Sequence, residues 1–80
     1  VYPHPVTQRS VVTVDLRREE HLELSVIDLF GDVRRHITTG IRTEGMHEFP
    51  LPVQGLPAGV YVIRLQWSDG MSHTPIVIPR

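Results

Sequence analysis

The sequence of 80 residues predicts an all-β fold, and three observations carry this prediction. Apolar side chains recur at every second position rather than at the 3.6-residue spacing of a helix. Glycine, proline and aspartate separate these runs at intervals of about 8–12 residues. No segment combines a helical apolar stripe with an N-cap residue. Short strands at this spacing are typical of an immunoglobulin-like antiparallel β-sandwich, here of about seven strands.

The expected strands are runs of β-branched or alternating residues. In order along the chain they cover residues 10–16, 21–28, 33–37, 46–51, 60–67 and 71–78. The run 60–67 carries apolar residues on both faces, which predicts a central place in its sheet. Pro75 and Pro79 cannot donate hydrogen bonds to a ladder, so the last strand is expected at a sheet edge.

Four connections join these strands. Residues 17–20 form a charged connector, and residues 50–59 form a loop that three prolines and a terminal glycine delimit. Gly31 supplies a position where positive φ costs little. Asp69-Gly70 lies between two strand-like runs and predicts a hairpin with a type I′ turn, which needs positive φ at both central residues.

The sequence contains no cysteine, so packing alone has to hold this single small domain together. The alternation selects the residues expected inside. They are Leu22, Leu24, Val26, Leu29, Val33, Tyr61, Ile63, Leu65 and Ile76. Residues 1–80 are therefore expected to form one domain around a plain apolar core.

Charge and targeting features exclude several classes of protein. All 8 basic residues are arginines, and they balance 9 acidic residues to a net charge of -1. This gives no electrostatic footprint for nucleic acid. No apolar run is long enough to span a bilayer. The first residue is not methionine and no signal peptide precedes it, so we interpret the chain as the C-terminal segment of a longer secreted protein.

The residues that usually carry chemistry stand in no catalytic or metal-binding pattern. The five histidines have no chelating spacing, and the bland interpretation is that they lie on the surface. The serines stand in no nucleophile elbow, and there is no glycine-rich phosphate loop. We therefore expect no enzyme activity, no metal and no cofactor.

Three segments, in this order, resemble one family. They are residues 1–5 (VYPHP), residues 26–34 (VIDLFGDVR) and residues 56–65 (LPAGVYVIRL). They are similar to the Tyr-Pro-Asn-Pro start, the Asp-Leu-x-Gly turn and the Leu-x-x-Gly-x-Tyr strand of type IX secretion C-terminal sorting domains, of the Bacteroidetes type. The resemblance implies ten sorting-motif residues. These are Tyr2, Pro3, Pro5, Asp28, Leu29, Gly31, Leu56, Gly59, Tyr61 and Arg80.

Most of these motif residues also have a structural interpretation. The Asp28 carboxylate can accept hydrogen bonds from backbone N–H groups of residues 30–32, as in an Asx turn. Gly59 would permit a tight approach before the central strand. Tyr61 would place its ring in the core and its hydroxyl near the edge.

This sequence departs from the family pattern near its two ends. His4 stands where the family has asparagine, Pro75 stands at an often basic position, and Arg80 replaces a terminal lysine.

The resemblance implies a non-catalytic secretion signal. Such a domain addresses an attached N-terminal cargo protein to the outer-membrane type IX translocon and its shuttle proteins. A sortase-like protease at the cell surface then cleaves it from the cargo. The expected location is secreted or at the surface of a Gram-negative bacterium, with transient passage through the periplasm.

Two other functions remain open from the sequence. An extracellular accessory sandwich could bind carbohydrate through Tyr61 and Trp67, or pack on a neighbouring catalytic domain. The second is a structural immunoglobulin module of the hook-capping type, although the Trp-Asp-Gly segment that normally precedes such a module is absent.

Overall fold

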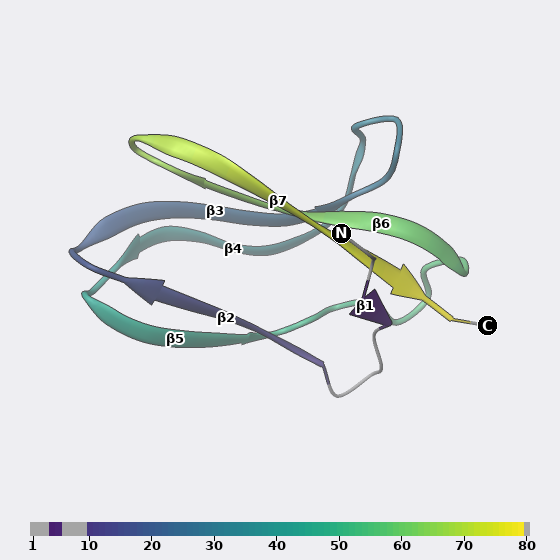
Figure 1. Ribbon diagram of the computed structural model, residues 1–80, viewed down its shortest axis with the longest axis horizontal. Helices are drawn as coiled ribbons and strands as arrows, with labels where there is room; N and C mark the ends of the chain where they lie inside the picture. Colours follow the sequence, from purple (N-terminus) through teal and green to yellow (C-terminus); the bar gives the residue numbers. More distant parts are fainter. Residues whose placement is uncertain (1–3, 6–9, 80) are drawn as a thin grey trace.

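Two facing β-sheets make up the part of the chain that the structure describes (Figure 1). The structure is a computed structural model and describes residues 4–5 and 10–79. Its strands are β1 (His4–Pro5), β2 (Val11–Leu16), β3 (Glu20–Ile27), β4 (Val33–Arg42), β5 (Gly45–Pro50), β6 (Gly59–Trp67) and β7 (Gly70–Ile78). Over these residues there is no helix, which confirms the all-β prediction.

The larger sheet has five strands in the order β1-β7-β6-β3-β4, and the smaller sheet pairs β2 with β5. All pairings are antiparallel except that of β1 with β7, which is parallel. The predicted antiparallel sandwich is confirmed, and β6 has the expected central place between β7 and β3. The parallel pairing of the short β1 has no signal in the alternation of the sequence.

Two of the expected strands differ from those observed. β4 runs to Arg42 rather than to residue 37, because pairing with β3 continues through Leu22↔Gly40 to Glu20↔Arg42. The polar residues before Gly40 hide this extension from a search for apolar alternation. β7 is not a free edge along its whole length, because β1 pairs with it at Ile76 and Val77.

The core fills the space between the sheets in two clusters. The first consists of Val26, Leu51, Val53, Leu56, Tyr61, Ile76 and Ile78, and the second of Val14, Leu16, Leu22 and Leu24. Val12, Ile37 and Ile63 pack against both clusters. The two clusters therefore form one continuous core.

Leu29 and Val33 were expected in this core, and that prediction is wrong. Leu29 is 69% exposed and Val33 is 40% exposed. Leu29 lies beyond the end of β3, in the turn before β4, where strand alternation no longer fixes the direction of a side chain. Val33 pairs with Ile27, the neighbour of the inward-facing Val26, so it lies on the outer face of the sheet.

The hairpin between β6 and β7 is confirmed, but its turn lies one residue earlier than predicted. Trp67 pairs with Gly70, so the two-residue loop is Ser68-Asp69. Among the described residues only glycines have positive φ, and Gly70 is not one of them, so the turn is not type I′. The Trp67 ring lies against Gly70, where an added Cβ would be 3.3 Å from Cζ2. The close approach of the Trp67 ring therefore explains why position 70 is a glycine.

Candidate functional site

The second and third motif segments meet at the end of the sandwich where β7 finishes. At this end Ile27 pairs with Val62, and Gly59 pairs with Ile78. The start of β6 therefore lies beside the C-terminal end of β7, and the turn between β3 and β4 lies at the same end of the sandwich, on the right of Figure 1. Pro5 joins the same end through its pairing with Val77. Tyr2, Pro3 and Arg80 lie outside the described residues.

Asp28 holds the turn between β3 and β4 in one conformation. Its Oδ1 accepts hydrogen bonds from the backbone N–H groups of Phe30 at 2.9 Å and Asp32 at 3.0 Å. The Gly31 N–H donates to the Asp28 carbonyl at 3.1 Å, and the Asp28 N–H donates to the Asp32 carbonyl at 3.0 Å. Arg34 adds an ion pair at 3.5 Å to Oδ2. The predicted carboxylate-capped turn is confirmed.

The same contacts set the charge state of Asp28. Partial desolvation raises the pKa of its carboxyl group, but the N–H groups of Asp32 and Phe30, together with Arg34, outweigh it. The pKa of Asp28 therefore lies below its ordinary value. A carboxyl group with a lowered pKa in the folded state stabilises the fold above its unfolded pKa, and this contribution is lost as the pH falls through the folded pKa.

Asp28→Asn is accordingly expected to make the free energy of unfolding less dependent on pH in the acidic range. Wild type should exceed the variant in stability from neutral pH down to the unfolded pKa of about 4, and this difference should shrink below that pH. Urea unfolding of both proteins at a series of pH values from 7 to about 2 measures the difference. A difference that stays constant across this range would show that the Asp28 charge does not stabilise the turn.

Tyr61 anchors the loop before β6 to the core. Its ring is buried in the first core cluster, and its hydroxyl donates a hydrogen bond of 2.7 Å to the carbonyl of Pro57. A tyrosine that bonds to the backbone a few residues upstream forms the tyrosine corner of immunoglobulin-like sandwiches. Leu56 is buried in the same cluster. The predicted position of the Tyr61 ring and hydroxyl is confirmed.

Tyr61→Phe keeps the ring and removes only this hydrogen bond. We expect the free energy of unfolding to fall by about 0.5–1.5 kcal/mol, because the Pro57 carbonyl loses its partner. Guanidinium chloride unfolding followed by circular dichroism measures the change. An unaltered midpoint and slope would mean that the corner contributes through ring packing alone.

Gly31 and Gly59 have positive φ values of 90° and 148°. An added Cβ at either glycine would meet no atom within 4 Å. The predicted positive φ of Gly31 is confirmed, whereas the tight approach predicted at Gly59 is wrong. Backbone conformation, and not the space around Gly59, requires glycine there.

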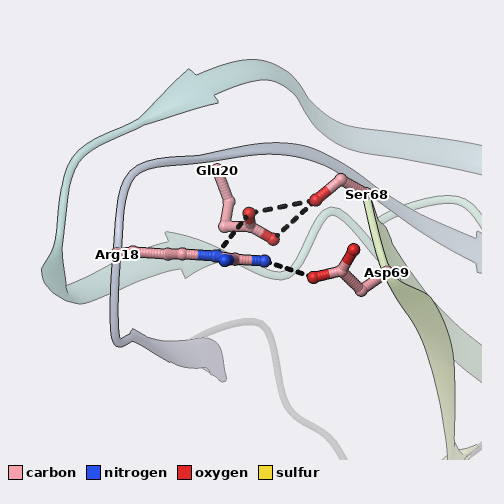
Figure 2. Close-up of polar contacts among 4 residues, drawn as sticks. All are labelled: Arg18, Glu20, Ser68 and Asp69. Atoms are coloured by element: carbon pink, nitrogen blue, oxygen red, sulfur yellow. Dashed lines mark hydrogen bonds and ion pairs between the residues drawn. The ribbon is translucent and has the colours of Figure 1, made fainter.

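A polar cluster lies at the opposite end of the sandwich, where β3 begins and β6 turns into β7 (Figure 2). Ser68 Oγ is 3.0 Å and 3.1 Å from the two carboxylate oxygens of Glu20, and Arg18 Nε is 3.2 Å from Glu20 Oε1. Arg18 also forms an ion pair with Asp69. The cluster ties the β2–β3 connection to the β6–β7 hairpin. Residues 17–20 were expected only as a charged connector, so this structural role of Arg18 and Glu20 was not predicted.

An apolar cleft of about 320 Å³ opens beside this cluster, between the two sheets. Its lining includes Val14, Leu16, Leu22, Leu65 and Trp67 from the second core cluster and its neighbours, with Arg18, Glu20 and Asp69 at its polar side. Arg18, Glu20 and Asp69 are paired with one another, whereas Asp15 and Arg17 also line the cleft. Most of the cleft lining is apolar, and its charged groups are confined to one side.

Tyr61 and Trp67 do not form a joint platform for a sugar ring. They lie on one face of β6, but the strand rise places them about 20 Å apart. Tyr61 is buried and its hydroxyl is already bonded, while Trp67 packs against the second core cluster. No three histidine, aspartate or glutamate side chains within residues 10–79 could hold a metal ion together.

Comparison with protein families identifies the fold's relatives. A family model described as "Secretion system C-terminal sorting domain" matches residues 1–79. The chain belongs to this family. The resemblance found in the three segments is confirmed, and the match covers both the Asp28 turn and the Tyr61 corner. No curated protein and no solved structure matches the chain.

Membership gives this sorting domain a role as a type IX C-terminal sorting signal. Domains of this family direct proteins to secretion or to the cell surface in Bacteroidetes, and theirs is not a catalytic family. Recognition by the secretion machinery and attachment to a cargo are part of that role. No helix long and apolar enough to cross a membrane occurs in the part of the chain that the structure describes.

Sequence reasoning missed the exposure of the motif turn. Leu29 was expected inside and Phe30 was assigned no role, yet both are exposed at the tip of the turn. The signal that could have found them is their position between Asp28 and Gly31. Residues inside a capped reversal of this length have no strand face to bury them.

Proposed function

We propose that residues 1–80 form a single non-catalytic sorting domain that addresses an N-terminally attached cargo to the type IX translocon. The family match over residues 1–79 carries this proposal. In it, the sorting domain passes through the periplasm with its cargo and is recognised by shuttle proteins and the outer-membrane translocon. A sortase-like protease at the surface then separates domain and cargo.

The structure supports a sorting signal that works as a folded domain. Tyr61 and Leu56 are buried, Gly59 and Gly31 supply positive φ, and Asp28 caps a turn. Each of these roles builds the fold. Substituting these residues would therefore impair sorting by unfolding the domain. A partner has to recognise the surface that the folded domain presents.

The position of β1 suggests where the cargo joins. β1 runs along the outer edge of the five-stranded sheet, beside the last residues of β7. A cargo polypeptide preceding the domain would join it at this edge. Cleavage between the two would then occur close to β1, at the edge of the five-stranded sheet opposite β4.

The experiment that tests this function fuses the 80 residues behind a periplasmic reporter. The fusion is produced in a host that has a type IX system, next to the same reporter carrying an established sorting domain. We expect the reporter to reach the cell surface in both cases. Retention of the fusion in the periplasm, while the established domain exports its reporter, would refute the proposal.

A further inference from the structure

Leu29 and Phe30 are two motif-segment residues whose exposed side chains the fold does not explain. Leu29 is 69% exposed and Phe30 is 91% exposed. They stand between Asp28, which caps the turn, and Gly31, which supplies its positive φ. A large aromatic side chain held almost fully in water gains nothing for stability and is a common anchor of protein interfaces.

The turn presents these two side chains on a rigid support. Four hydrogen bonds close residues 28–32, and the Asp28–Arg34 ion pair joins the turn to the start of β4. In Figure 1 the connection between β3 and β4 projects beyond the sheets at the upper right. A tip that is already ordered loses little conformational entropy when a partner binds it, which favours recognition.

Apolar residues continue from the tip onto the outer face of the five-stranded sheet. Ile27 pairs with Val33 on one side and Val62 on the other, so the three share this face. Val33 and Val60 are each 40% exposed. Leu29, Phe30, Val33 and Val60 together are called the apolar tip below. It lies at the end of the sandwich that holds the motif turn and the tyrosine corner.

We propose that the sorting domain docks through the apolar tip into an apolar pocket on a protein of the secretion machinery. This inference rests on the proposed sorting function and names the surface that performs it. The remaining motif residues then have a clear purpose: Asp28 and Gly31 build the turn that holds Leu29 and Phe30 outward.

Charge and size favour a protein pocket over the other possible occupants. An anionic membrane would be attracted by a net positive charge, but Arg34 and Arg35 are balanced by Asp28, which pairs with Arg34, and by Asp32 in the turn. A second copy meeting the tip face to face would bury little beyond two side chains. Stable dimers bury about 800 Å² per partner. A concave pocket can instead surround the tip on all sides.

The test compares two double variants of the reporter fusion. Leu29→Ser/Phe30→Ser removes the two most exposed side chains of the apolar tip and leaves the backbone bonds of the turn in place. The matched control, Ile41→Ser/Met46→Ser, removes two other large apolar side chains, 64% and 68% exposed, near the opposite end of the sandwich. Phe30→Leu is a third variant, which keeps the tip apolar.

We expect the tip variant to lower the surface-exposed reporter about tenfold or more, because interface anchors commonly carry this much binding energy. The control and Phe30→Leu should export like wild type. Denaturant midpoints of the purified domains establish that all variants fold. If wild type and the folded tip variant export equally, the apolar tip is not the docking surface and the sorting function stands. If wild type itself is retained, the sorting function fails first.

Two further measurements distinguish the occupants. A free copy of the domain, produced in the periplasm, should compete with the fusion and reduce its export, and the free tip variant should not. The purified domain should remain unbound to vesicles of phosphatidylethanolamine and phosphatidylglycerol and should sediment as a monomer. Vesicle binding or self-association that disappears in Leu29→Ser/Phe30→Ser would assign the tip to a membrane or to a second copy, and would overturn the proposal.

Discussion

Leu24→Ala is expected to lower the free energy of unfolding by about 2–5 kcal/mol. Leu24 is only 1% exposed and lies in the second core cluster with Val14, Leu16 and Leu22. Truncation leaves a cavity between the sheets that neighbouring strands cannot fill without moving. Domains of this length have a total stability of about 4–12 kcal/mol, so the loss is a large share of the whole.

Denaturant unfolding measured by Trp67 fluorescence reports this loss, because the Trp67 ring packs against the same cluster. Ile41→Ala is the matched control, since Ile41 is an exposed aliphatic side chain on β4, the strand that pairs with β3. It should change stability by no more than about 0.5 kcal/mol. Similar losses in both variants would contradict the position of the core between the sheets.

Gly59→Val is expected to cost about 1–3 kcal/mol through backbone strain. Gly59 has a φ of 148°, which a β-branched residue rarely adopts, and the space around it is open. The variant therefore measures conformational strain without a clash. Because Gly59 opens the strand that carries Tyr61, the strain should also weaken the hydrogen bond to Pro57.

A comparison with alanine isolates the cause of this loss. Every L residue is strained at a φ of 148°, and the space around Gly59 is open, so Gly59→Ala should cost nearly as much as Gly59→Val. A much smaller loss for Gly59→Ala would point to the larger side chain rather than to φ. Urea midpoints of the three proteins, measured at one pH, decide between these causes.

Local patterns in the sequence predict most of the strands and part of the core. Leu22, Leu24 and Val26 alternate along β3 and are all fully or almost fully buried. The Asp28 turn and the Tyr61 hydroxyl were predictable for the same reason, because their partners lie within four residues along the chain. A short run of sequence contains both donor and acceptor in these cases.

Features that depend on distant segments could not be predicted. The Arg18–Asp69 pair joins residues far apart in the sequence, and the parallel pairing of β1 with β7 joins the two ends of the domain. The Ser68-Asp69 loop was misplaced because the Trp67 ring, and not a type I′ turn, requires Gly70. Leu29 was misplaced because it lies beyond the end of β3, where strand alternation no longer fixes the direction of a side chain.

The most direct test of the sorting function is protease digestion of intact cells that carry the reporter fused to residues 1–80. Two strains are compared, one with the complete type IX system and one lacking its outer-membrane translocon. The sorting function predicts that added protease removes the reporter in the first strain and leaves it intact inside the second. Equal protection in both strains, while an established sorting domain distinguishes them, would contradict the assignment of this chain as a secretion address.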